Sequence, residues 1–114
     1  MKAFWILAAV AGLSGPALAH AFLTEAHPRA GENAKPTPIK IELHFTEPLE
    51  PTFSSIAVTN EAGQDVTASA ATANGTEMDV ALKPLAPGRY RVTWHAVSVD
   101  THKTQGGFNF TVAP

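Results

Sequence analysis

The feature that most constrains the fold of this chain is a repeated alternation of apolar and polar residues with a period of two. It runs through residues 38–45, 77–82, 88–97 and 107–112. Because successive side chains of a β-strand point to opposite faces, this pattern predicts strands with one face on a core and the other in water. The residues expected to face the core are Ile39, Ile41, Leu43, Phe45, Met78, Val80, Leu82, Tyr90, Val92, Trp94, Ala96, Phe108, Phe110 and Val112.

Turn-forming residues separate these stretches. Residues 54–60 add a further strand, and residues 61–64 form its turn. Proline and glycine mark other turns at 28–31, 36–38, 48–51, 74–75 and 84–88. After residue 20 the sequence has no convincing helical stripe. Short strands with a turn about every ten residues predict an all-β, single-domain, seven-stranded Greek-key β-sandwich.

The first 19 residues have the layout of a secretory signal peptide. Lys2 gives a positive start, residues 3–13 form an apolar run, and Ala17-Leu18-Ala19 is a small-residue cleavage site. The run is too short to span a bilayer, which takes roughly 20 apolar residues. We therefore expect residues 1–19 to be cleaved rather than retained as an anchor. Residues 20–114 should form a soluble domain that is exported, in a bacterium to the periplasm, and that begins at His20.

The composition of residues 20–114 narrows the classes of partner. These 95 residues carry 7 basic and 10 acidic side chains, a net charge of −3 when histidine is neutral. This mild negative charge argues against nucleic acid and anionic membranes as partners. The sequence has no cysteine, which excludes disulfides and thiolate metal ligands. We expect a domain that is stabilised by packing and does not insert into a membrane after cleavage.

The five histidines differ in what their positions predict. His44 and His95 occupy polar phases of alternating strands, so we expect both to face solvent. His27 precedes Pro28 in a turn-rich segment, where a plain loop histidine is favoured over a second metal ligand.

Asp100 and His102 lie in a stretch between two predicted strands, and loops on a rigid sandwich commonly display binding residues. In extended chain their spacing of two points both side chains to one face, as either a metal half-site or a hydrogen-bonded pair. A histidine at position one of the mature chain offers its α-amine and imidazole Nδ1 to one metal. Three nitrogens from His20 and His102 with an Asp100 oxygen would suit tetragonal Cu(II). From composition alone, an accidental N-terminal histidine is equally compatible.

Three stretches together resemble the CopC family of periplasmic copper-binding proteins: HAFLTEAHPRAGE, IKIELHFTEPLE and GRYRVTWHAVSVDTHKTQGGFNF. The resemblance covers residues 20–112. Its most specific parts are His20 after the cleavage site, the Y-x-V-x-W pattern at 90–94 and the S-x-D-x-H pattern at 98–102. It implies a seven-stranded Greek-key sandwich of the immunoglobulin-like or cupredoxin-like kind.

The resemblance also implies a metal site that binds one Cu(II) per chain through His20, Asp100 and His102. Glu47 matches an acidic position near that site in the family. Some members bind Cu(I) in a methionine-rich loop, and Cu(I) prefers thioether or thiolate ligands. Here Met78 is the only methionine after residue 20, and its phase places it in the core. We therefore expect a protein that binds Cu(II) only.

Three classes of function follow from these residues. The resemblance implies a non-enzymatic protein for copper sequestration, resistance or delivery to an inner-membrane importer of the CopD type. The enzyme alternative is a copper oxidase of the lytic polysaccharide monooxygenase type, which also holds copper with an N-terminal histidine. An oxidase needs a surface for a polymer, and only Phe22 and Phe53 are aromatic residues clearly off the core pattern. The third alternative is a metal-free adhesin or pilus subunit.

Overall fold

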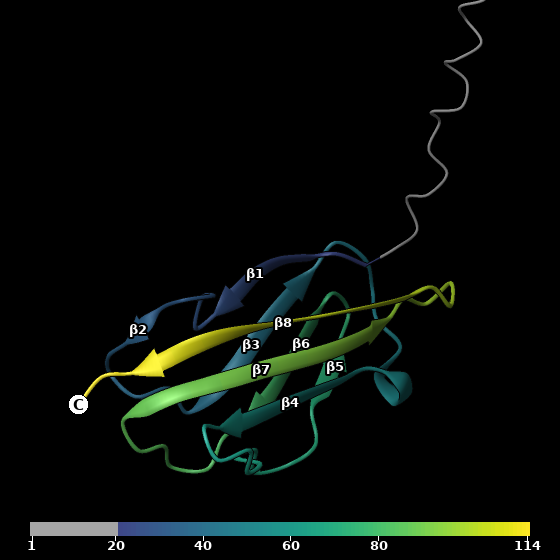
Figure 1. The fold of residues 1–114 in the computed structure, drawn as a ribbon. Helices are drawn as coiled ribbons and strands as arrows, with labels where there is room; N and C mark the ends of the chain where they lie inside the picture. The colour runs from purple at the N-terminus through teal and green to yellow at the C-terminus, as the bar shows by residue number, and fades with distance from the viewer. Residues whose placement is uncertain (1–20) are drawn as a thin grey trace, which may run out of the picture.

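The computed structural model describes residues 21–114, which form a β-sandwich (Figure 1). The predicted signal peptide, residues 1–19, and His20 lie outside the described residues. The elements are β1 Leu23–His27, β2 Asn33–Ala34, β3 Lys40–Phe45, a single 3-10 turn η2 at Pro51–Phe53, β4 Ser55–Asn60, β5 Thr72–Asn74, β6 Glu77–Ala81, β7 Gly88–Val97 and β8 Lys103–Val112. In this part of the chain no helix is long and apolar enough to cross a membrane.

The strands form two four-stranded sheets. One has the order β1-β3-β6-β5 and the other β2-β8-β7-β4. The pairs are antiparallel except β2 with β8, and the chain crosses repeatedly between the sheets, as the predicted sandwich requires. The all-β class is confirmed, but the described residues form eight strands rather than seven. The two-residue β2 is too short to carry an alternating pattern.

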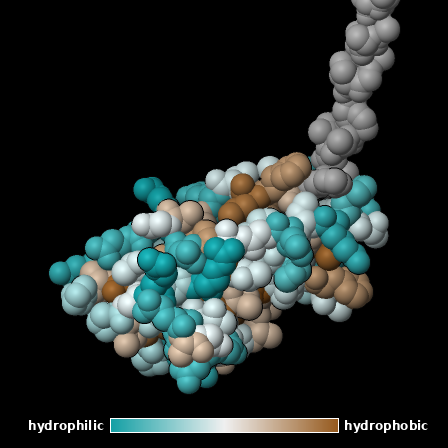
Figure 2. Space-filling view, viewed as in Figure 1, coloured by the Kyte–Doolittle hydropathy of each residue, from teal (hydrophilic) through white to brown (hydrophobic). Residues whose placement is uncertain are grey.

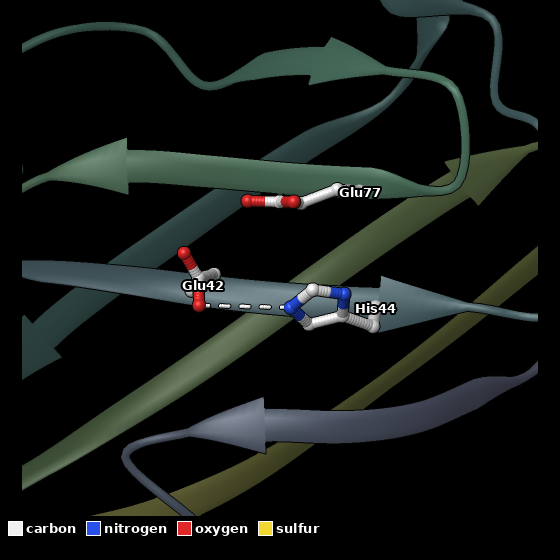
Figure 3. A group of neighbouring side chains, drawn as sticks. All are labelled: Glu42, His44 and Glu77. Atoms are coloured by element: carbon white, nitrogen blue, oxygen red, sulfur yellow. Dashed lines mark ion pairs between the residues drawn. The ribbon is translucent and has the colours of Figure 1, made fainter.

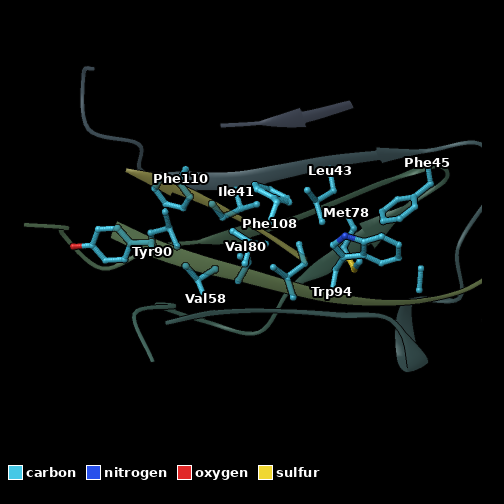
Figure 4. Close-up of a cluster of buried hydrophobic side chains, with 14 of the residues drawn as sticks. Ile41, Leu43, Phe45, Val58, Met78, Val80, Tyr90, Trp94, Phe108 and Phe110 are labelled. Atoms are coloured by element: carbon cyan, nitrogen blue, oxygen red, sulfur yellow. The ribbon is translucent and has the colours of Figure 1, made fainter. Parts of the chain in front are cut away.

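The predicted alternation correctly identifies the core between the sheets (Figure 4). All of the listed inward residues are buried except Ile39, whose side chain is 78% exposed. Ile39 precedes the first residue of β3, and its carbonyl accepts a hydrogen bond from Leu82 N–H at 2.9 Å. Its backbone therefore continues the pairing of β3 with β6, while its side chain lies outside the core.

Aromatic pairs fix both ends of the core. Phe45 and Trp94 meet edge-to-face with ring centroids 5.1 Å apart, and Tyr90 stacks on Phe110 at 5.4 Å. Pairs of this kind contribute about 0.5–1.5 kcal/mol beyond their burial. The Tyr90 hydroxyl also donates a hydrogen bond to the Ala86 carbonyl at 2.6 Å. These contacts attach the β7–β8 hairpin to the core along its length.

Candidate metal centre

The loop between β7 and β8 is a tight turn over residues 98–102. Ser98 N–H donates to the His102 carbonyl at 2.9 Å, and Thr101 N–H donates to the Ser98 carbonyl at 2.8 Å. Thr101 has a φ of 75°, in the left-handed region. The sequence correctly predicted a loop here, but the extended conformation assumed for Asp100 and His102 is wrong. The turn, not strand geometry, brings their side chains to the same side.

Asp100 and His102 form an ion pair at the tip of this turn. Nδ1 of His102 lies 3.3 Å from Oδ1 of Asp100, and each side chain is 48% exposed. The Ser98 hydroxyl donates a short hydrogen bond to the same Asp100 oxygen, and Ser98 is itself buried. The hydrogen bond from Ser98 is the largest cause that lowers the pKa of the Asp100 carboxyl below its usual value, and the hydrogen bond from His102 is the next largest. The carboxylate is therefore ionised and oriented before any metal binds.

The segment before η2 clamps the turn from the side. Glu50 N–H donates to the Val97 carbonyl at 2.7 Å, and Val99 N–H donates to the Pro48 carbonyl at 3.1 Å. Glu47, the acidic residue that the resemblance places near the site, directly precedes Pro48 and is partly buried. The clamp therefore holds the segment that carries Glu47 against the turn that carries Asp100.

The start of the described chain is anchored beside the same turn. Ala21 is fully buried, and its carbonyl accepts a hydrogen bond from the Thr104 hydroxyl at 2.7 Å. Phe22 N–H donates to the Thr46 hydroxyl at 2.9 Å, and the Phe22 carbonyl accepts from Thr46 N–H at 2.9 Å. Because Thr104 is two residues after His102, the residue that follows His20 is fixed next to the predicted site. The sequence carried no local signal for this anchor.

The remaining histidines lie elsewhere. His95 is exposed on β7, as predicted. His27, expected in a loop, is instead the last residue of β1, where its Nε2 lies 2.7 Å from a Glu25 oxygen. His44 lies on the outer face of its sheet, as predicted, but only 33% of its side chain is exposed because its neighbours cover it. The His27 and His44 rings meet at right angles, with centroids 6.4 Å apart.

Sequence patterns did not reveal a second group of possible metal ligands. Glu42, His44 and Glu77 lie on β3 and β6 with one ligand atom each within 4.8 Å of the others (Figure 3). Hydrogen bonding from Lys40 is the largest cause that lowers the pKa of Glu42, and His44 contributes in the same direction. The β3–β6 register pairs His44 with Glu77 directly, and a sequence pattern does not reveal which strands pair.

An apolar groove of about 720 Å³ adjoins the β7–β8 turn. Phe53, His95, Thr101 and Lys103 are among the residues that line it, and Phe53 is 67% exposed. Figure 2 shows apolar surface interleaved with polar side chains toward this end of the molecule. Phe22, 55% exposed, is the second aromatic residue expected off the core, and both expectations are confirmed.

Comparison with known proteins decides the family. The sequence model of the CopC domain family matches residues 23–113 of this chain. The chain belongs to the CopC family. Its relatives include protein YobA of Escherichia coli K12, 38% identical over 82% of this chain and 79% of that protein. Copper resistance protein C of Escherichia coli is 34% identical over 90% and 89% of the two chains. The copper transport protein CutJ of Bacillus subtilis is 34% identical over 82% of this chain but only 18% of CutJ.

Solved CopC structures have the same fold. CopC from Methylosinus trichosporium OB3b matches with a TM-score of 0.78 and 32% identity, over 83% of this chain and 95% of that one. PcoC of Escherichia coli, described as a methionine-rich copper resistance protein, matches with a TM-score of 0.69 and 36% identity, over 82% and 99%. The resemblance to CopC proteins inferred from the sequence is therefore confirmed, as is the β-sandwich class.

Proposed function

We propose that this CopC protein, cleaved after Ala19, is a periplasmic Cu(II)-binding protein that uses His20, Asp100 and His102 to hold one copper ion. The observation that carries the proposal is the preformed Asp100–His102 pair beside the anchored Ala21. Nδ1 of His102 and Oδ1 of Asp100 lie 3.3 Å apart, so both atoms can reach one copper ion.

The ligand set matches Cu(II) better than Cu(I). The amine and imidazole of His20, the imidazole of His102 and an Asp100 oxygen give the nitrogen and oxygen donors that tetragonal Cu(II) accepts. Met78 is fully buried between the sheets, so its thioether is not offered to Cu(I) at the surface. PcoC is described as methionine-rich, whereas this chain has one methionine after residue 20. We therefore assign Cu(II), and not Cu(I), to this protein.

The role that fits such a site is copper sequestration, resistance, or delivery to an inner-membrane importer of the CopD type. Two relatives support this role by name, as a copper resistance protein and a copper transport protein. In CutJ the matched region is a small part of a longer transport protein, which is consistent with a copper-binding domain working beside a transporter.

Copper titration of the mature protein tests the site. One equivalent of Cu(II) should bind with nitrogen hyperfine coupling in electron paramagnetic resonance. His20→Ala and His102→Ala should each lose most of the affinity because each removes a strong nitrogen donor. Asp100→Ala should cost less, since a water oxygen partly replaces the carboxylate. Wild-type affinity in both histidine variants would refute the assignment, and His95→Ala is the matched control on the same hairpin.

The oxidase alternative is favoured by one observation, the apolar groove beside the turn. Against it, an Asp100 oxygen bound to copper occupies a position that oxygen activation needs open. The copper-loaded protein should therefore show no peroxide-dependent oxidation of a polysaccharide or test substrate above that of a His102→Ala control. Turnover lost with His102→Ala would support the oxidase and overturn the binding role.

A further inference from the structure

The outer face of the β1-β3-β6-β5 sheet carries a cluster of imidazoles and carboxylates that shares no residue with the copper site. The β3–β6 register places His44 opposite Glu77, and Glu42 lies two residues before His44 on the same face of β3. Nε2 of His44 is 3.6 Å from Oε1 of Glu42. Figure 3 shows these three side chains gathered over adjacent strands, with the carboxylate of Glu77 on the side of β6 that faces β3.

From this geometry we propose that Glu42, His44 and Glu77 form a second metal site, which binds a divalent transition-metal ion of the Zn(II) or Cu(II) type. One imidazole with two carboxylates is a donor set that such ions accept in proteins. The proposal goes beyond copper binding at the β7–β8 turn and does not depend on it.

The spacing of the ligand atoms suits a metal after a small adjustment. Their present separations are within 4.8 Å. Ligand atoms about 2.0–2.2 Å from a tetrahedral zinc are roughly 3.3–3.6 Å from each other. The cluster therefore has to contract by a little over an ångström at its widest, which rotation of partly exposed side chains achieves without moving the strands. Three protein ligands leave one position for water, so the bound ion would be exchangeable.

The charges around the cluster favour a cation. The carboxylates of Glu42 and Glu77 extend from neighbouring strands onto the same face, where like charges oppose each other. Lys40 pairs with Oε2 of Glu42 at 3.4 Å and with Asp79 at 3.9 Å. Within residues 21–114, no ion pair includes Glu77. A divalent ion at the cluster would neutralise the carboxylate that lacks a cationic partner here.

The neighbouring strand adds a second imidazole beside the cluster. His27 of β1 pairs in register with Glu42, and its ring meets that of His44 at right angles, 6.4 Å between centroids. Nε2 of His27 is held by Glu25 at 2.7 Å. Two imidazoles on one face favour transition metals over Mg²⁺ or Ca²⁺, which prefer oxygen ligands.

Calorimetric titration with Zn(II) tests the proposal on mature protein already loaded with one equivalent of Cu(II). We expect one further equivalent of Zn(II) to bind. His44→Gln and Glu77→Gln should each weaken this binding at least tenfold, since even partners outside the ligand shell are worth about 10–100-fold. His95→Gln, on the exposed face of the other sheet, should leave it unchanged. Absence of the additional equivalent, or unchanged affinity in His44→Gln, would overturn the site.

Lys40→Gln supplies a test that misfolding cannot imitate. Removing the amine that competes for Glu42 should tighten Zn(II) binding a few-fold, and a damaged fold would weaken it instead. The ring signals of His44 should also shift in NMR spectra on addition of Zn(II), while those of His95 stay in place. Weaker or unchanged binding in Lys40→Gln would count against Glu42 as a ligand.

The proposal of this second metal site and the proposal of the copper site can be refuted independently of each other. In His102→Ala without copper, Zn(II) should still bind at Glu42, His44 and Glu77 and shift the His44 signals. If His102→Ala abolishes the additional Zn(II) equivalent, the second site is refuted and the metal belongs to the turn. If instead His102→Ala leaves Cu(II) affinity unchanged while His44→Gln lowers it, the copper proposal is refuted and this cluster is the main site.

Discussion

Ser98 is the residue on which the arrangement of the β7–β8 turn depends most. Its hydroxyl bonds Asp100 and lies 3.4 Å from the His102 carbonyl, while its N–H bonds that carbonyl at 2.9 Å. The S-x-D-x-H pattern drew attention to this residue, but its role follows from a turn rather than a strand. A buried hydroxyl in this place sets the charge and direction of a candidate ligand without touching the metal.

Replacing Ser98 by alanine should raise the pKa of Asp100 toward its ordinary value, because the largest cause of its lowering is removed. A carboxyl whose pKa is lower in the folded state stabilises the fold above its unfolded pKa of about 3.9, and this contribution is lost as the pH falls through the folded value. The metal-free variant should therefore lose less stability than wild type on acidification through that range. Carboxyl NMR titration measures the shift.

Asp65 provides an internal control for this measurement. Its pKa is also lowered, by hydrogen bonds from the Thr67 backbone and side chain, and it lies far from Ser98 in the sequence. The Asp65 titration should be the same in wild type and Ser98→Ala. An unchanged Asp100 pKa in the variant would show that His102, not Ser98, holds the carboxylate.

At the scale of the elements, the β7–β8 hairpin was the most predictable part of the chain. Strict alternation through β7 fixed which residues face the core, because both faces of the hairpin have a clear polarity. β1 was missed because its pairing with β3 is irregular between Leu23 and Glu25, which breaks the period of two. β5 is only three residues long and buries none of them fully.

The candidate site was predictable only where its residues are close in sequence. Asp100 and His102 are two residues apart, so a pattern could find them. The bond from Thr104 to Ala21 joins residues 83 apart, and the His44–Glu77 pair depends on strand register. These long-range contacts are determined by packing of the whole sandwich, which local periodicity does not encode.

Packing of Trp94 leaves no room for a side chain at Gly106, near the end of the hairpin. It pairs with Trp94 in register, and a Cβ added there would lie 2.7 Å from the buried indole ring. Gly106→Ala should therefore push Trp94 out of its packing with Phe45 and lower the free energy of unfolding by about 1–3 kcal/mol, the usual cost of overpacking. Chemical denaturation followed by Trp fluorescence measures the loss. Gln105→Ala, at the exposed neighbour, should change little, and equal effects of both would reject the steric explanation.

The hydrogen bond from the Thr104 hydroxyl to the Ala21 carbonyl predicts that β8 positions the N-terminal segment for copper binding. Thr104→Val keeps the shape of the side chain and removes the donor to the Ala21 carbonyl. A hydrogen bond of this kind contributes about 1 kcal/mol, so Cu(II) affinity should fall about fivefold while the tetragonal spectrum is kept. Competition titration with a copper chelator gives the change. An unaltered affinity would mean that β8 does not position the N-terminal segment.

At the scale of the whole molecule, the proposed site would connect the start of the domain to the loop before its last strand. His20 would bring the first residue of the domain to the last loop before the final strand, so the bound ion cross-links segments that are more than 75 residues apart. A ligand that binds only the folded state stabilises it by mass action. Saturation with Cu(II) should therefore raise the melting temperature of the wild-type protein, and much less that of His102→Ala.

The position of the His20 amine gives the sharpest test of this whole-molecule closure. Leaving Ala19 attached keeps every side chain of the domain but moves the amine one residue away, so the chelate ring of amine and Nδ1 at His20 can no longer form. Metal must also displace protons from its ligands, and an α-amine titrates at about 7.7–8.0 against about 6.5 for imidazole. Cu(II) affinity of the mature protein should thus fall as the pH drops through both values. The extended protein should bind more weakly and show a shallower slope between about pH 6.5 and 8, measured by calorimetry at several pH values. Equal affinity and equal slope in the two forms would show that His20 is an ordinary first residue.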